Sequence, residues 1–232
     1  AATCPPSRSV MRRVEPSGAA VRAGTFALGD SFLLGSTRVL TAAHVRVDAK
    51  VGRQFFEGIP ELRAVARSGT LPRNLLVHLG TNGYIALSDC KAIVSAAGTG
   101  RPFLGVCVGM QLLATRGLEF GVTPGLGWIA GEVKRLETRD PSCKVPHMGW
   151  NGLTGLTGQP ILAGMGEGTP MYFTHSFAFY PADEGDVAAW VDHGGRFPAA
   201  VARGNVAGVQ FHPEKSQGAG LSLLARFLEW RP

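Results

Sequence analysis

The sequence predicts an α/β fold in which a doubly wound, mainly parallel sheet is followed, after residue 117, by a glycine-rich mixed or antiparallel portion. Two observations predict it. From residue 25 onward, short apolar runs alternate with helical stretches, the rhythm of right-handed βαβ units. After Gly117, glycine-punctuated apolar runs follow one another instead. We expect residues 24–232 to form a single domain, preceded by a flexible basic lead-in at residues 1–23.

The first half supplies the expected βαβ elements in order. Because the carboxyl ends of parallel strands hold ligands in such sheets, the residues that follow each strand are candidates for a site. Ser31, residues 80–82, Cys107 and His212 all follow an expected strand. The strands are expected at 25–28, 45–51, 74–79 and 102–106, and the helices at 55–68, 85–97 and 108–115, with one more ending near residue 43.

The second half is expected to form strands that pair with one another in a mixed or antiparallel way. They are expected at 127–133, 171–176, 187–191 and 199–201, with a further strand leading to Phe211. Leucines and a phenylalanine at helical spacing predict a closing helix at 221–230.

The composition of the chain excludes several classes of function. At 232 residues, with 45% hydrophobic and 17% charged residues, the chain suits one large domain. Its four cysteines lack paired or metal-type spacing, so we expect a reducing, cytoplasmic setting and no metal. No apolar run reaches the roughly 18 residues that span a bilayer, so no membrane partner is expected. The net charge of +6 is scattered without an aromatic-interleaved basic stripe, which argues against nucleic acid.

Cys107 is the first candidate for chemistry. It stands in Gly105-Val106-Cys107-Val108-Gly109, where an apolar strand breaks between two glycines and then continues as a helical stretch. This pattern is typical of a nucleophile elbow, and a helix N-terminus behind a thiol favours the thiolate. A lone cysteine in an apolar run is more often a small buried hydrophobe. The flanking glycines favour the catalytic interpretation.

A base and an orienting carboxylate follow about a hundred residues later. His212 ends the apolar run Gly208-Val209-Gln210-Phe211, and Glu214 comes two residues after it. Nucleophile, base and orienting group are the three parts of a catalytic triad. The sequence therefore predicts Cys107, His212 and Glu214 as catalytic residues.

Residues 101–232 resemble the glutaminase subunits of imidazole glycerol phosphate synthases, a family of triad-type glutamine amidotransferases with a flavodoxin-like sheet. Four motifs in the right order carry the resemblance. They are Arg101-Pro102-Phe103-Leu104-Gly105-Val106-Cys107-Val108-Gly109-Met110-Gln111, Lys144-Val145-Pro146-His147-Met148-Gly149-Trp150-Asn151, Tyr172-Phe173-Thr174-His175-Ser176 and Gln210-Phe211-His212-Pro213-Glu214-Lys215-Ser216-Gln217.

The resemblance implies a role for each matching residue. Cys107 would attack the carboxamide of L-glutamine, His212 would pass the proton to the departing ammonia, and Glu214 would orient the imidazole. The positions that hold glutamine would be Gln111, Glu119, Tyr172 and Ser176. Taken singly, Gln111 could equally lie on a helix surface and Tyr172 in the core.

The resemblance also implies a partner, a cyclase subunit that forms a heterodimer with this chain and receives the ammonia. His147, Trp150 and Lys215 would lie at that interface, and no cofactor is expected. The family's Pro-Gly-Val-Gly loop, which supplies an oxyanion amide, is absent from this chain. We expect Gly80 and Thr81 to replace it, with Val108 as the other oxyanion donor.

Residues 24–97 resemble the first half of an SGNH hydrolase domain. The matching residues lie in Gly29-Asp30-Ser31, Val51-Gly52-Arg53-Gln54 and Val77-His78-Leu79-Gly80-Thr81-Asn82-Gly83. The resemblance implies Ser31 as nucleophile, with Gly52 and Asn82 holding the oxyanion. The Asp-X-X-His that ends such domains is absent, so the chain resembles a composite joined near residues 98–101.

Three functions therefore stay open. The first is a glutaminase that delivers ammonia to a cyclase, and the second is a serine esterase or acyltransferase that uses Ser31. The third is a folded composite without activity, because a displaced oxyanion donor is costly to catalysis.

Overall fold

The computed structural model describes residues 25–29, 33, 37–53, 55–67, 74–78, 101–119 and 121–232. The lead-in at 1–23 and the helix expected at 85–97 lie outside these residues. The central sheet is built from β1 (Thr25–Gly29), β2 (Arg46–Ala49), β3 (Asn74–His78), β4 (Phe103–Val106), β11 (Val187–Asp192), β12 (Arg196–Arg203) and β13 (Val206–Val209).

The strand order in this sheet is β11-β12-β13-β4-β3-β1-β2 among the described strands. Every neighbouring pair from β13 to β2 is parallel, whereas β11, β12 and β13 pair antiparallel. Parallel strands whose ends share one edge bring their following residues together. The predicted mainly parallel α/β fold is thus observed, with the four strands expected before residue 107 in place.

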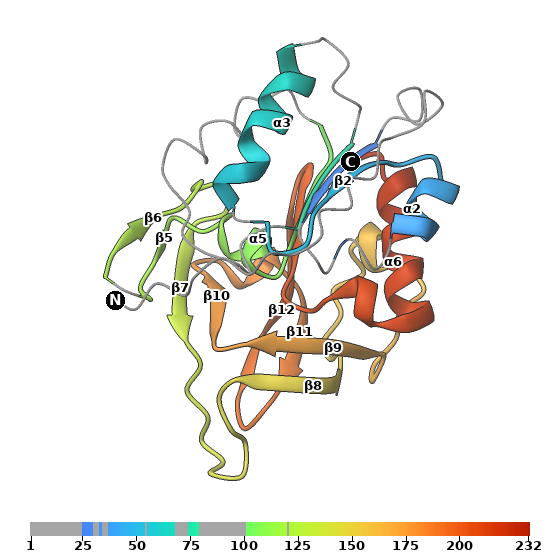
Figure 1. Cartoon of the computed structure of the whole chain (residues 1–232). Coiled ribbons are helices and arrows are strands. Elements are labelled where there is room, and N and C mark those ends of the chain that lie inside the picture. The colour runs from blue at the N-terminus through green and yellow to red at the C-terminus, as the bar shows by residue number, and fades with distance from the viewer. Residues whose placement is uncertain are drawn as a thin grey trace.

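Helices cover both faces of the sheet. Along β1, Phe26 and Leu28 pack into one core cluster together with Leu62 of α3 (Phe55–Arg67). The intervening Ala27 belongs to the other cluster, which holds Leu40 of α2 (Thr37–Ala42) and Leu223 of α6 (Gln217–Glu229). Figure 1 accordingly shows α3 on one side of the sheet and α2 with α6 on the other. Because successive side chains of a strand point to opposite faces and both faces are covered, the central positions of β1 are all apolar.

Apart from β11, β12 and β13, the strands from residue 116 onward form two smaller sheets. One holds β5 (Arg116–Gly117), β6 (Thr123–Pro124), β7 (Gly131–Arg135) and β10 (Phe177–Pro181), and the other pairs β8 (His147–Gly152) with β9 (Pro170–His175). Within the described ranges, three short 3₁₀ turns, η2 (Pro160–Leu162), η3 (Glu184–Asp186) and η4 (Pro213–Lys215), complete the elements. The smaller sheets confirm the predicted mixed or antiparallel portion.

The helix after Cys107 is shorter than predicted, because α5 spans only Val108–Gln111. The next carbonyls leave the helical ladder. Leu112 and Leu113 accept the N–H groups of Leu126 and Ile129 at 2.8 and 3.1 Å. Backbone pairing with the segment before β7 thus ends the helix early. The same pairing explains why β7 begins at Gly131 and not at residue 127.

A buried asparagine connects the sheet to the last helix. The side-chain amide of Asn74, at the start of β3, donates to the carbonyl oxygens of Phe227 and Leu228 at 2.7 and 3.2 Å. Carbonyls at a helix C-terminus lack the usual intrahelical partner, and the Asn74 amide adds a donor to these two, which also accept from the Trp230 N–H and Arg231 Nη1. The first and last parts of the chain are therefore joined directly.

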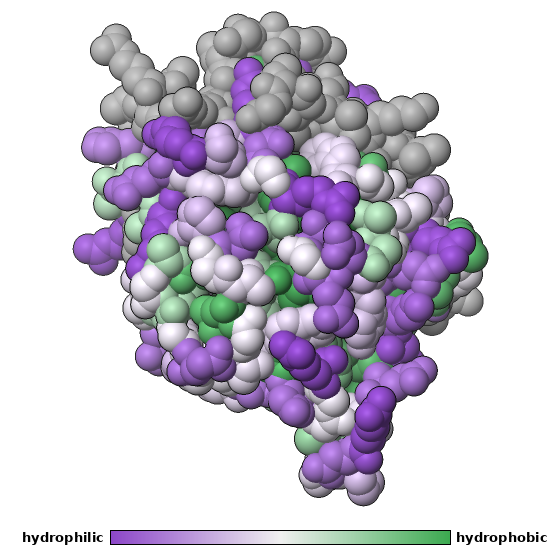
Figure 2. All heavy atoms as spheres, turned by 180° about the vertical axis from the view of Figure 1, so that it is seen from behind, coloured by the Kyte–Doolittle hydropathy of each residue, from purple (hydrophilic) through white to green (hydrophobic). Residues whose placement is uncertain are grey.

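The surface opposite the view of Figure 1 is mixed. Among the coloured atoms of Figure 2, hydrophobic residues show only in small separate areas between polar ones. No helix in the described ranges is both long and apolar enough to cross a membrane.

Candidate active site

Cys107 occupies a sharp turn between β4 and α5. Its backbone has φ 53° and ψ −111°, a region that residues with a side chain rarely adopt, and the residue is buried. Such a conformation costs about 1–3 kcal/mol and persists only where the surroundings fix it. Here the Cys107 N–H donates to Val209 of β13 at 2.8 Å, and its carbonyl accepts from Met110 at 3.0 Å. The thiol is thus held at the carboxyl edge of the sheet.

The two flanking glycines allow this turn to pack closely. A Cβ on Gly105 would lie 2.2 Å from the carbonyl oxygen of Gly109, and a Cβ on Gly109 would lie 2.8 Å from that of Val77. Both distances are shorter than van der Waals contact. The Gly-X-Cys-X-Gly pattern is therefore a steric requirement for packing α5 against β4 and β3.

One glutamine contacts the thiol, and a second glutamine contacts the first. The side-chain amide of Gln210, which is fully buried, donates to Cys107 Sγ at 3.7 Å. Its Oε1 accepts from Gln111 Nε2 at 3.0 Å, and Gln111 also donates to the carbonyl of Phe177 at 2.9 Å. Gln111 therefore contacts the thiol's neighbour Gln210 and does not lie on an outer helix surface. Gln210 belongs to one of the four sequence motifs but had no predicted role.

His212 and Glu214 lie just beyond β13, the strand next to β4. Glu214 Oε1 accepts from His212 Nδ1 at 2.9 Å, and both side chains are almost fully buried. Burial lowers the pKa of His212, although Glu214 opposes this shift. Burial alone would raise the pKa of Glu214, but hydrogen bonds from His212 and His78 bring it well below its usual value. Glu214 is consequently an anion that fixes the His212 ring.

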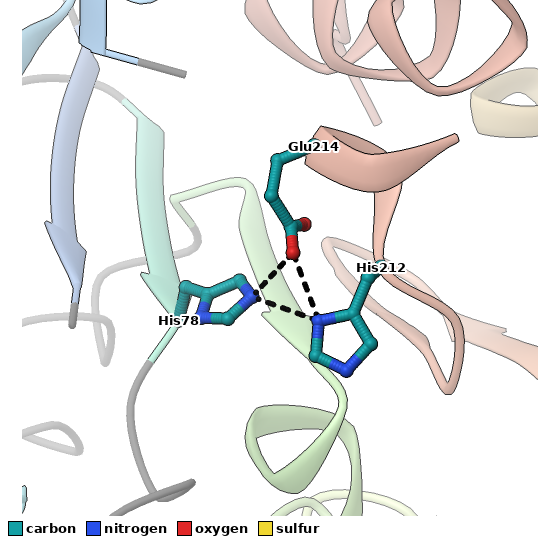
Figure 3. A group of neighbouring side chains, drawn as sticks. All are labelled: His78, His212 and Glu214. Carbon is teal, nitrogen blue, oxygen red and sulfur yellow. Dashed lines mark hydrogen bonds and ion pairs between the residues drawn. The ribbon is translucent and has the colours of Figure 1, made fainter. Parts of the chain in front are cut away.

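His78 contacts both His212 and Glu214, and no role was predicted for His78 from the sequence. It is the last residue of β3 and is buried. Its Nε2 lies 3.3 Å from His212 Nδ1 and 3.3 Å from Glu214 Oε1. Figure 3 shows the three polar atoms facing one another. The available signal was its place at the end of a strand next to the cysteine strand.

Three predicted residues meet on the outer face of β8 and β9. The Trp150 ring contacts the Tyr172 ring edge to face at 5.9 Å, and Lys215 Nζ lies 5.2 Å from the Tyr172 ring centre. Trp150 is 49% exposed and Met148, on the same face of β8, is 63% exposed. An apolar surface next to a lysine thus lies close to His212, whose N–H donates to the Tyr172 carbonyl at 2.8 Å.

His147 does not reach this outer face. It is buried, its ring stacks on Phe173 and His193, and its Nδ1 lies 3.2 Å from His175 Nε2. Burial and the neighbouring histidines lower the pKa of His147 to about 3. Burial likewise lowers the pKa of His175 to about 4. His147 and His175, called the histidine stack below, are therefore uncharged at neutral pH and form part of the interior.

The remaining predicted residues are more scattered. Val108 begins α5, so its N–H lies at the helix N-terminus. Ser176 lies between β9 and β10, and its carbonyl accepts from Leu136 at 2.9 Å. Glu119 is exposed after β5, and Gly52 follows β2 with φ 67°. Ser31, Gly80, Thr81 and Asn82 lie outside the described residues.

Sequence comparisons place this geometry in a family context. Residues 72–230 match the family model described as Glutamine amidotransferase class-I. The chain is 55% identical over 161 residues to the imidazole glycerol phosphate synthase subunit HisH of Caulobacter vibrioides, a match that covers 65% of this chain and 76% of that protein. Against the same-named subunits of Zymomonas mobilis and Rhodospirillum rubrum, the identities are 59% and 54%. Those matches cover 57% and 66% of this chain and 61% and 70% of the relatives.

Solved structures share the fold. A glutamine amidotransferase from Thermotoga maritima superposes with a TM-score of 0.58 at 14% identity, covering 89% of this chain and 99% of that one. A putative GMP synthase protein from Thermoplasma acidophilum gives a TM-score of 0.57 at 17% identity, covering 88% and 93%. At these identities the likeness concerns the fold alone.

Proposed function

Because the chain belongs to the class-I glutamine amidotransferase family, we propose that it is the glutaminase subunit of an imidazole glycerol phosphate synthase. It hydrolyses L-glutamine through a cysteine thioester and passes the ammonia to a cyclase subunit in histidine biosynthesis, in the cytoplasm. One observation carries the proposal. The strained Cys107 turn and the His212–Glu214 pair follow neighbouring parallel strands, β4 and β13.

Each side chain has a chemical role in this proposal. His212, oriented by Glu214, accepts the thiol proton as Cys107 Sγ attacks the glutamine carboxamide carbon. The same imidazole then gives that proton to the departing nitrogen, which leaves as ammonia. Water attacks the remaining thioester and releases glutamate. The anionic Glu214 stabilises the imidazolium formed in the first step.

The remaining assignments concern binding. The N–H of Val108 and an amide from Gly80 or Thr81 hold the oxyanion, and Gln111, Glu119, Tyr172 and Ser176 hold the rest of the glutamine molecule. The hydrogen bond from Gln111 to Gln210, the residue next to the Cys107 thiol, supports the assignment of Gln111. We place all of these residues in a single domain spanning 24–232, with residues 1–23 as a lead-in.

The cyclase interface is proposed at the outer face of β8 and β9. Exposed Trp150 and Met148, with Lys215 beside them, give that face an apolar centre and a basic edge. A heterodimer formed there would lie close to His212, so ammonia would cross a short path into the partner. His147 acts on the interface indirectly, by supporting β8 from within.

The experiment measures glutamate released from L-glutamine by this chain, with and without a cyclase subunit of imidazole glycerol phosphate synthase. Cys107→Ala is expected to abolish release, whereas Cys143→Ala, at the other cysteine in the described residues, is expected to retain it. Equal release by wild type and Cys107→Ala would overturn the proposal.

A composite origin is proposed for the first part of the chain. The resemblance to an SGNH hydrolase covers residues 24–97, of which residues 24–71 lie outside the family match. Gly52 follows β2, on the edge of the sheet that also carries His212. The alternative function is therefore a serine esterase or acyltransferase. Short-chain ester hydrolysis that survives Cys107→Ala and is lost in Ser31→Ala would favour it, and a chain inactive in both assays would be an inactive composite.

A further inference from the structure

Three buried polar atoms converge between β3 and η4. His78 Nε2, His212 Nδ1 and Glu214 Oε1 lie 3.3, 2.9 and 3.3 Å from one another. Their side chains are only 2%, 0% and 4% exposed. Figure 3 shows that they point toward one another, His78 from the end of β3 and the other two from the segment after β13. The proposed glutaminase chemistry uses His212 and Glu214 but gives His78 no role.

Hydrogen bonds can occupy this triangle in more than one way. If both ring nitrogens carry a hydrogen, both donate to the Glu214 oxygen, and the two donors, His78 Nε2 and His212 Nδ1, face each other at 3.3 Å. If His78 Nε2 lacks its hydrogen, it can accept from His212 Nδ1 but loses its bond to Glu214. A cation that accepts one lone pair from each atom would bind all three at once.

The dimensions match those of a zinc site. Zinc binds imidazole nitrogen and carboxylate oxygen at about 2.0–2.2 Å, and sets of two histidines and one glutamate are known zinc ligands. An ion about 2.1 Å from each of the three atoms would lie about 1 Å out of their plane. We propose that His78, His212 and Glu214 bind Zn²⁺ and that the bound ion reversibly blocks the glutaminase reaction.

The block follows from the chemistry of the imidazole ring, and this part rests on the proposed function. In the working tautomer, His212 Nδ1–H donates to Glu214, and Nε2 carries the lone pair that accepts the thiol proton. A zinc ion on Nδ1 requires a lone pair there, so the ring hydrogen moves to Nε2. His212 then has no lone pair for the thiol proton. Zinc also occupies Glu214, the group that orients the ring.

Metal binding is tested without reference to activity. The full chain, freed of metal with a chelator, is titrated with Co²⁺ as a spectroscopic substitute for Zn²⁺, and Zn²⁺ is then used to displace it. We expect one site per chain. His78→Gln should weaken it by more than about tenfold, the smallest loss expected when even a group supporting a ligand is removed. His193→Gln, a histidine outside the triangle, should leave it unchanged.

The cobalt spectrum separates this site from simple thiol binding. A nitrogen and oxygen ligand set gives no sulfur-to-cobalt charge-transfer band, and Cys107→Ala should bind the ion as tightly as wild type. Strong charge transfer, loss of binding in Cys107→Ala, or unchanged binding in a folded His78→Gln protein would each overturn the proposal. Circular dichroism of every variant checks folding, and the wild-type spectrum tests the ligand set even if His78→Gln does not fold.

Inhibition is the last measurement. Zinc should inhibit glutamate release by wild type, a chelator should restore it, and His78→Gln should need more than about ten times as much zinc. Equal zinc sensitivity of the two proteins would refute the inhibitory site. Absence of any glutaminase activity in the metal-free protein would instead refute the proposed function, and the cobalt titration would still decide the metal site.

Discussion

Gln210 places its side-chain amide 3.7 Å from the sulfur of Cys107. The amide is directed there by Gln111, which donates to the Gln210 oxygen and so leaves the nitrogen toward the thiol. Because buried polar groups need hydrogen-bond partners, this contact fixes the orientation of the Gln210 side chain. The glutamine is thus anchored at its oxygen and offers a donor to sulfur at its nitrogen.

The Gln210 amide predicts a kinetic effect on the thiol. Gln210→Leu removes a donor to sulfur that is stronger when the sulfur is charged, so the reactive thiolate loses stabilisation. A hydrogen bond to a charged group contributes about 1.5–3 kcal/mol, and at this length we expect about the lower end, roughly a tenfold slower reaction. The rate of Cys107 alkylation by iodoacetamide and the rate of glutamate release both measure it. Gln159→Leu, far from the thiol in sequence and half-buried, is the control. Equal alkylation rates would contradict the effect.

A steric prediction follows from Gly105. Its added Cβ would lie 2.2 Å from the Gly109 carbonyl oxygen, so Gly105→Ala must push α5 away from β4. Overpacking of this kind costs about 1–3 kcal/mol of stability. Displacing the nucleophile should also lower glutaminase activity by at least about a hundredfold.

Urea unfolding and the activity assay measure these two effects of Gly105→Ala. Gly166→Ala is the matched control, because a Cβ there meets no atom within 4 Å. If Gly105→Ala keeps full activity, the close approach of α5 to β4 is not needed for the site.

The histidine stack predicts a stability that depends on pH. Folding holds the pKa values of His147 and His175 at about 3 and about 4, below the ordinary value of 6.5. Between these values the unfolded chain binds more protons than the folded one. The free energy of unfolding is therefore largest above pH 6.5 and falls as pH drops from 6.5 toward 4, by up to about 1.4 kcal/mol per pH unit for each histidine.

Urea unfolding at several pH values checks this slope. His147→Phe keeps an aromatic ring beside Phe173 and removes one titrating group, so its slope should be smaller than that of wild type. Arg139→Gln, an exposed substitution outside the stack, should keep the wild-type slope. Identical slopes in wild type and His147→Phe would mean that the stack does not titrate on unfolding.

Asn74 predicts coupling between the two ends of the domain. Asn74→Ala removes one donor from the carbonyls of Phe227 and Leu228, which keep the Trp230 N–H and Arg231 Nη1 as donors. We expect a loss of about 0.5–1.5 kcal/mol in the free energy of unfolding, the net contribution of a hydrogen bond. The transition should stay single, because residues 24–232 are proposed to form one domain. Two separate transitions, or no change in stability, would contradict this coupling.

The sequence predicted best those elements whose signal is local. Continuous apolar runs placed β1, β3 and β4 to within one residue at either end, and Cys107 could be located from its two glycines. The length of α5 was not foreseen, because it depends on hydrogen bonds to residues 125–129. The strand β8 was interpreted only as a motif, since its two glycines interrupt the alternation of apolar and polar residues. His78 was missed as part of the site because nothing in its own run signals the carboxylate it meets, 136 residues later in the chain.

The position of β4 has a consequence for how the protein is made. This strand, which carries the nucleophile, pairs with β3 on one side and with β13 on the other. A ribosome delivers β13, at residues 206–209, long after β4. Until then β4 presents an unpaired apolar edge, the kind of template on which nascent chains aggregate. The protein should therefore need its whole length before the sheet can close, and fragments that end before residue 206 should depend on chaperones for solubility.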